Sequence, residues 1–166
     1  MKDERLVVSN TSPLLNLALI GRLDLIDDQF STVTVPSQVW DELMAGSEGV
    51  ETLQTYRDAG TIHVVPVLES ELLVEFRREL DIGEAATLAY AIEEDSSLVL
   101  LDEREGRKAA RRHSLAVTGA IGVLLRGAND GDVDLESELD ALRDAGFWIS
   151  DSLYQEVLKR SRSDTK

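Results

Sequence analysis

The sequence predicts an α/β fold in which a central parallel sheet of four or five strands is flanked by helices. Short apolar segments rich in Val, Leu and Ile alternate with longer stretches whose apolar residues recur at the helical period. Such alternation is typical of βαβ units, whose parallel strands are buried between layers of helices. The 166 residues also have the length of one domain with a substantial core, and no repeat or linker divides them. We therefore expect a single domain over residues 1–166.

Five segments have the length and composition of buried strands: Leu6–Ser9, Thr32–Val35, Ile62–Val65, Leu98–Leu101 and Leu115–Val117. Helical patterns lie between and after them: Ser12–Leu19, Pro36–Met44, Val50–Ala59, Glu69–Leu80, Glu84–Glu94, Glu103–His113 and Thr118–Ala128. We expect Ser12 to cap the first helix, with Pro13 at its first position, where the missing N–H costs nothing.

The C-terminal part, from about residue 135, is expected to add two helices that dock on the body of the domain. These are Leu135–Ala145 and Asp151–Arg160. Between them, Phe147, Trp148 and Ile149 form an apolar segment. Since large apolar side chains favour burial, we expect this segment to act as a plug against the body.

The net charge of −15 has two interpretations. It could serve a basic partner, or it could reflect adaptation to a cytoplasm of very high salt, where an acidic surface keeps a protein soluble. Acidic residues are scattered along the chain, and lysine occurs only at positions 2, 108, 159 and 166. This pattern favours the halophilic interpretation, so the charge does not exclude a nucleic-acid partner.

Several other classes of protein are excluded or disfavoured by the sequence. Cysteine is absent, which excludes disulfides and thiolate metal sites. His63 and His113 lack metal-spaced partners, and no apolar run is long enough to cross a membrane, so we expect a cytoplasmic protein. There is no P-loop motif, and Thr118 follows a late strand where a receiver domain would carry lysine.

Four polar residues are candidates for a metal site. Asn10 and Asp102 follow two of the expected strands, while Glu42 and Glu84 lie on expected helices. In a parallel sheet they converge on the carboxyl edge, where α/β folds bind ligands. Clustered carboxylates repel one another unless a cation is present, and oxygen ligands suit a hard ion such as Mg²⁺.

Structural roles compete with this interpretation. Glu84 is equally consistent with a helix-capping residue and with a metal ligand, because both roles suit an acid in the first turn of a helix. Glu42 lies at the edge of its buried stripe and has the same ambiguity. Asp102 is a stronger candidate because it directly follows four apolar strand residues, although aspartate is also a common N-cap.

A basic stripe follows Asp102. It consists of Arg104, Arg107, Lys108, Arg111 and Arg112, opposite the small residues of the same helix. A solvated helix face is the usual explanation for such a run. Beside an expected metal site in an acidic chain, the stripe instead favours binding of a polyanion.

The chain resembles PIN-domain proteins, specifically the subgroup that opens with Ser-Asn-Thr-Ser-Pro-Leu, here residues 9–14. The resemblance covers nearly the whole chain. It is carried by Val7–Leu15, Leu23–Ile26, Val35–Leu43, Gly83–Ala86, Leu101–Glu103, Arg107 with Ala110, Thr118–Leu124 and Gly146–Asp151. No single motif is decisive, but their order and spacing are specific. The resemblance implies a three-layer fold and a metal-dependent ribonuclease of the toxin–antitoxin kind.

In such a nuclease, Mg²⁺ or Mn²⁺ would be held by Asp102, Glu84 and Glu42, with Asn10 in a position usually occupied by aspartate. Ser12 and Thr118 would help to position metal, water or phosphate. The expected partners are single-stranded RNA, an antitoxin protein and a second copy of the chain in a homodimer. The open alternative is a PIN-like module that binds RNA or protein with weak or no catalysis, because Asn10 brings no negative charge to the metal.

Overall fold

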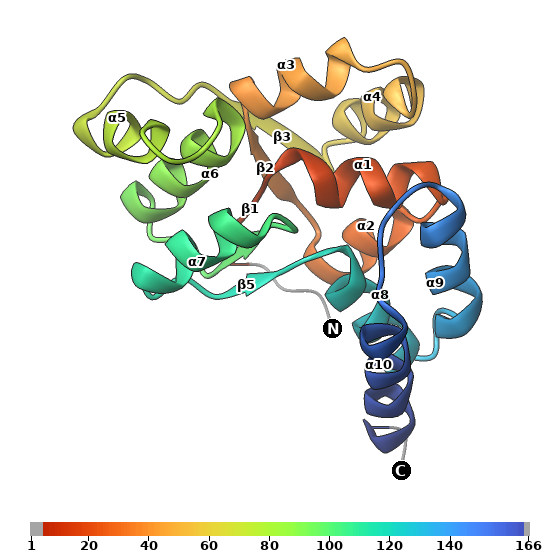
Figure 1. Cartoon of the computed structure of the whole chain (residues 1–166). Helices are drawn as coiled ribbons and strands as arrows, with labels where there is room; N and C mark the ends of the chain where they lie inside the picture. The colour runs from red at the N-terminus through yellow and green to blue at the C-terminus, as the bar shows by residue number, and fades with distance from the viewer. Residues whose placement is uncertain (1–4, 165–166) are drawn as a thin grey trace.

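The computed structural model describes residues 5–164 and contains a five-stranded, wholly parallel sheet with the order β3-β2-β1-β4-β5 (Figure 1). The strands are β1 (Val7–Ser9), β2 (Val33–Pro36), β3 (Ile62–Val65), β4 (Leu98–Leu100) and β5 (Val117–Thr118). The predicted α/β fold is therefore confirmed. The terminal residues 1–4 and 165–166 of the expected domain lie outside the described part.

Ten helices surround this sheet within the described residues. Those of the first half are α1 (Thr11–Leu19), α2 (Asp24–Phe30), α3 (Ser37–Ala45), α4 (Val50–Asp58) and α5 (Glu71–Arg77). Those of the second half are α6 (Ile82–Glu93), α7 (Arg104–Arg112), α8 (Ala120–Asn129), α9 (Leu135–Asp144) and α10 (Asp151–Asp164). Within residues 5–164, no helix combines the length and the apolar character that a bilayer span requires.

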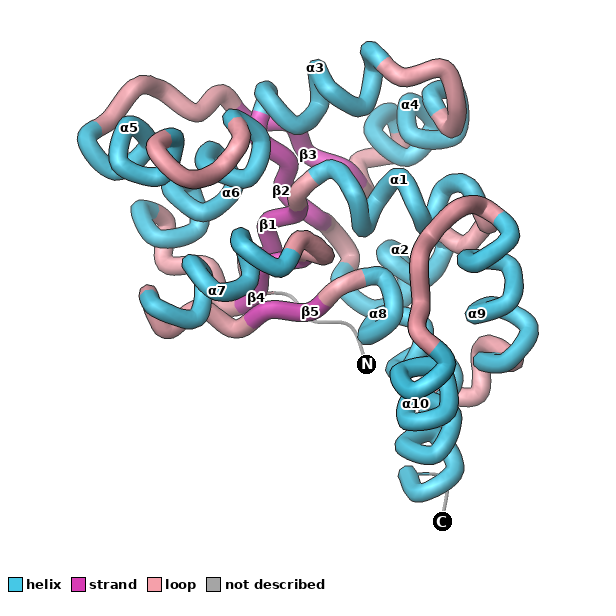
Figure 2. The backbone as a smooth tube through the Cα atoms, viewed as in Figure 1, coloured by secondary structure: helices cyan, strands magenta, loops and turns pink. Residues whose placement is uncertain are grey.

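The sheet lies between two helical layers, each with its own core (Figure 2). Helices α5, α6 and α7 cover one face, and α1, α2, α8 and α9 cover the other. Successive strand residues alternate between the cores: Val7 belongs to the α1 side and Val8 to the α6 side. Burial on both faces explains why the strands are continuously apolar rather than alternating with polar residues.

Helix α2 was not predicted. Leu25, Ile26 and Phe30 bury its inner face against the core on the α1 side. The helix has only seven residues, and its N-cap residue is Leu23, whose side chain has no hydrogen-bond acceptor to cap the helix. Neither the length nor the start of α2 therefore produces a recognisable sequence signal, and packing supplies its stability.

The expected start of the first helix is wrong by two residues. The N-cap of α1 is Asn10, and Pro13 is the third helical residue rather than the first. The backbone N–H of Asn10 donates to the carbonyl of Leu100 at 3.0 Å, so the chain leaves the sheet only at residue 10. Thr118 is likewise the last residue of β5, and α8 begins at Ala120.

The predicted apolar plug is only partly correct. Ile149 is buried and Phe147 packs against the same core, but 82% of Trp148 is exposed. Arg143 Nη2 donates to the carbonyl of Ile149 at 2.8 Å, which fixes this segment between α9 and α10. The tryptophan therefore stands on a well-held backbone with its indole facing outward.

Candidate metal and nucleic-acid site

The sheet reverses its strand order between β1 and β4, which are neighbours although they are far apart in sequence. Crevices at such switch points are the usual ligand sites of open α/β sheets. Asn10 follows β1 directly, and Asp102 comes two residues after β4. The topology thus places both residues at one point on the carboxyl edge, as expected.

Asn10 and Glu42 converge above the first turn of α6. A side-chain carbon at Gly83 would lie 3.1 Å from Glu42 Oε2 and 3.3 Å from Asn10 Oδ1. Thr11 holds the glutamate in place, because its hydroxyl donates to Glu42 Oε2 at 2.9 Å. Glu42 is exposed at the rim, whereas Asn10 is buried. These residues therefore bring two side-chain oxygens to the same side of Gly83.

Glu84 is buried in the first turn of α6, with only 8% exposed. It does not cap this helix, since Asp81 Oδ1 accepts the backbone N–H of Glu84 at 2.8 Å. Burial, followed by interactions with Asp81 and then Glu103 and Glu42, raises the pKa of Glu84 from 4.5 to about 8. The carboxylate lies against Gly106, where a side-chain carbon would meet Oε2 at 2.9 Å. A larger residue at position 106 would displace it.

Asp102 approaches the start of α8, whose first N–H, that of Ala120, donates to Oδ1 at 3.0 Å. Burial raises the pKa of Asp102, and the opposing influences, in decreasing order, are the Ala120 N–H, Arg107 and the Asn16 side chain. A side chain at Gly119 would collide with Oδ1. Asp102 thus has a structural role at a helix N-terminus in addition to any role in metal binding.

Two buried oxygens at this edge, Asn10 Oδ1 and Asp102 Oδ2, accept no hydrogen bond of normal geometry from the described residues, although the Asn16 side chain approaches the Asp102 carboxylate. Buried polar atoms are normally paired, so such atoms require an explanation. All the candidate ligands are oxygens, as hard divalent cations prefer. The chemistry of this set fits Mg²⁺ or Mn²⁺, and such an ion would supply the partner that the two unpartnered oxygens lack.

The acids nevertheless do not form a compact cluster. Among residues 5–164, no three His, Cys, Asp or Glu side chains lie close enough together to hold a metal ion. Asn10 and Glu42 converge, while Glu84 and Asp102 are each held by a different neighbouring element. Any ion would therefore have to draw these groups together.

Sequence reasoning missed Glu103 and Asp81. Glu103 contributes to the raised pKa of both Glu84 and Asp102, and its Oε1 accepts a hydrogen bond from Ser12 Oγ at 3.1 Å. Asp81 stands three residues before Glu84, the spacing of a capping box, which is a signal that the sequence contains. Glu103 directly follows Asp102, but its neighbours come from distant segments and leave no local signal.

The basic stripe lies on the outer side of α7, whose inner side buries Gly106, Ala109 and Ala110. Arg112 pairs with Glu79, and Lys108 lies 3.7 Å from Glu105. Arg104 and Arg111 are exposed and form no ion pair within the described part of the chain.

Arg107 differs from the rest of the stripe because it is half-buried and faces Asp102, whose pKa it lowers. Thr118 lines the same hollow as Arg107 and Asp102, and its hydroxyl lies against Gly122. A hydroxyl, a guanidinium and a carboxylate therefore share one surface beside the sheet edge.

A family model described as a PIN domain matches residues 6–163, nearly the whole chain. No curated protein matches the sequence. The parallel sheet, the helices on both faces and the acids at the switch point agree with that match. The chain belongs to the PIN-domain family.

Proposed function

We propose that this protein is a Mg²⁺- or Mn²⁺-dependent endonuclease that cleaves single-stranded RNA. Membership of a nuclease-type family supports a hydrolase. The observation that carries the proposal is a pair of unpartnered, buried oxygens, Asn10 Oδ1 and Asp102 Oδ2. They follow the carboxyl ends of the neighbouring strands β1 and β4. Two buried acceptors without donors are costly unless a cation is bound to them.

In this proposal Asp102, Glu84, Glu42 and Asn10 hold the ion. When bound, the ion would supply an activated water at neutral pH and would stabilise charge on the phosphate oxygens. The protein's own groups orient the ligands. Thr11 fixes Glu42, and the start of α8 fixes one oxygen of Asp102 while leaving the other available.

The remaining basic and hydroxyl groups orient the RNA. Arg104 and Arg111 would bind phosphates on the approach to the edge, with Lys108 and Arg107 alongside them. Thr118 would contact the backbone beside Asp102, because both line the same hollow. Ser12 would act indirectly by orienting Glu103, to which it already donates.

Further proposals follow from the family. We propose that the protein is cytoplasmic, that it is the toxin of a toxin–antitoxin pair and that it forms a homodimer. Its acidic surface would be adapted to high salt, as its net charge of −15 and scarce lysine suggest. Light scattering in 2 M KCl checks the dimer, and unfolding in rising KCl checks the salt adaptation.

The second candidate is a PIN-like module that binds RNA without cleaving it. The specific observation that favours it is the lack of a compact three-acid group within the described residues. The neutral Asn10 adds to this, because one negative charge at ~4 Å from the ion is worth on the order of a few kcal/mol at an effective dielectric near 20.

Incubation of the pure protein with mixed RNAs distinguishes the two candidates. The reactions contain Mg²⁺, Mn²⁺ or EDTA at high salt, and gels report both cleavage and complex formation. Three results together support the nuclease: cleavage requires metal, Asp102→Asn abolishes it, and the exposed control Asp144→Asn retains it. RNA bound but intact in every metal supports the module.

A further inference from the structure

A hollow of about 620 Å³ connects the candidate site with the C-terminal helix. Its lining comes from four parts of the fold: the sheet edge with Asp102 and Thr118, the basic helix with Arg107, helix α8 with Ile121 and Leu125, and the α9–α10 region with Trp148, Leu153 and Arg160. Its volume lies within the range of small-ligand pockets. We call this hollow the Trp148 groove.

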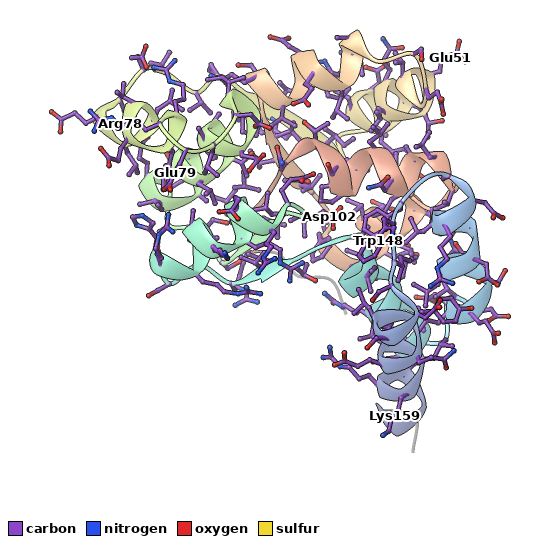
Figure 3. The ribbon with its side chains drawn as sticks, in the orientation of Figure 1. Glu51, Arg78, Glu79, Asp102, Trp148 and Lys159 are labelled. Carbon is purple, nitrogen blue, oxygen red and sulfur yellow. The ribbon has the colours of Figure 1, made fainter. Side chains whose placement is uncertain are left out.

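Trp148 is the most exposed large apolar side chain of the described residues. Figure 3 labels Trp148 and Asp102, and both residues line the groove. Its neighbours on the chain anchor the backbone, because Ile149 is buried and its carbonyl accepts a hydrogen bond from Arg143. The indole is thus held in place at the groove while remaining open to solvent. The partly exposed Leu153 lines the same groove, and exposed apolar side chains that share one surface indicate an interaction site.

The charges in the groove indicate the kind of partner. Arg107 and Arg160 both line it, in a chain whose net charge is −15. An aromatic face flanked by guanidinium groups matches single-stranded nucleic acid, in which bases stack on the ring and phosphates meet the cations. Arg107 already faces Asp102, but an apolar peptide would use the tryptophan and leave Arg160 without an anionic counterpart.

We propose that the Trp148 groove binds single-stranded RNA, with one base stacked on Trp148 and the adjoining phosphodiester facing Asp102. This inference rests on the proposed function and adds to it the subsite that positions the strand. The stacking surface is sequence-tolerant, because every base has a π-face. The groove therefore selects an unpaired, unstacked strand rather than a particular base.

The test measures binding separately from cleavage. Trp148 emission is recorded while an eight-nucleotide uridine RNA is added, once in EDTA and once in Mg²⁺. The chain has one other tryptophan, the buried Trp40, which gives a constant background. The variants are Trp148→Ala, Trp148→Phe and the control Leu68→Ala, a residue that is 78% exposed and does not line the groove. An abasic oligomer with the same number of phosphates separates stacking from charge.

We expect the RNA to quench Trp148 and the abasic oligomer to leave its emission unchanged. Because these variants lack the Trp148 signal, the affinity of every protein is also measured by the fluorescence anisotropy of a 5′-labelled RNA. Trp148→Ala should bind the RNA about tenfold more weakly, and Trp148→Phe should retain most of the affinity because a ring remains. Leu68→Ala should bind like the wild type. Circular dichroism and melting curves establish that each variant is folded.

The absence of quenching in both buffers would overturn the inference, as would equal affinity of wild type and Trp148→Ala. A change in oligomeric state in Trp148→Ala, with RNA affinity unchanged, would show that a second copy of the chain covers this surface and would also overturn it. The proposed nuclease fails separately. Quenching of Trp148 without cleavage in any metal would support RNA binding in the groove and contradict the proposed nuclease activity. Cleavage that Trp148→Ala leaves unaffected would support the nuclease activity and contradict RNA binding in the groove.

Discussion

Replacing Glu84 with glutamine should stabilise the metal-free protein at neutral and alkaline pH. Burial and the neighbouring acids raise the pKa of Glu84 from 4.5 to about 8. Each pH unit of such a difference corresponds to about 1.4 kcal/mol. The full rise is therefore worth at most about 4 to 5 kcal/mol, and relaxation of the site should reduce the observed value to roughly 2 to 4 kcal/mol.

The direction follows from proton binding. Because the pKa of Glu84 is higher in the folded protein than in the unfolded chain, the folded protein binds the proton more tightly between pH 4.5 and about 8. The free energy of unfolding should therefore fall as the pH rises through this window. Glutamine cannot ionise, so Glu84→Gln should lack this part of the decline.

Urea unfolding in EDTA at pH 5, 6, 7, 8 and 9, at one constant salt concentration, measures the effect. The matched control is Glu93→Gln, an exposed position on the same helix, which removes the same charge from the surface. We expect the Glu84→Gln and wild-type curves to diverge by a few kcal/mol toward pH 8, while Glu93→Gln follows the wild type. If the free energy of unfolding depended on pH in the same way for all three proteins, the raised pKa of Glu84 would be refuted.

Variants at three other places test the remaining parts of the site. Asp102→Asn keeps an acceptor for the Ala120 N–H and should abolish cleavage without loss of stability. Asp102→Ala should abolish cleavage and also lower the free energy of unfolding in urea by about 1 kcal/mol, because the helix cap is lost. Equal stability of the two variants would contradict the capping role. Asn10→Asp should show a larger Mn²⁺-induced rise in melting temperature than the wild type, because it adds a charge beside the ion; equal shifts would place residue 10 away from the metal. Replacing both Arg104 and Arg111 with alanine should lower the salt slope of RNA binding by about 1.4, from two lost phosphate contacts on a single strand. The control is Arg78→Ala, at the residue that follows α5. An unchanged slope in the double variant would show that the basic face of α7 is only solvated.

Local patterns in the sequence determine most of the secondary structure. The strand Ile62–Val65 is found as predicted, and most other strands and helices begin and end within two residues of their expected bounds. The predicted strand Leu115–Val117 shares only Val117 with β5, and the predicted helix Glu69–Leu80 is shortened to α5. The reason is that strands buried on both faces become continuous apolar runs, whereas helices buried on one side repeat apolar residues at the helical period, and both patterns are visible in the order of the residues. Helix α2 escaped prediction because its seven residues are too few for such a period to stand out.

The sequence by itself also placed Asn10 and Asp102 at one edge, because parallel strands share the direction of their carboxyl ends. Only the tertiary structure decided what their side chains meet. The hydrogen bond from Ala120 to Asp102 and the glycine surfaces that receive Glu84 and Glu42 join segments far apart in the chain. The exposure of Trp148 was decided in the same way, since an apolar residue is buried only where the folded surface offers a place for it. Such contacts depend on distances across the fold, and these have no counterpart in local periodicity.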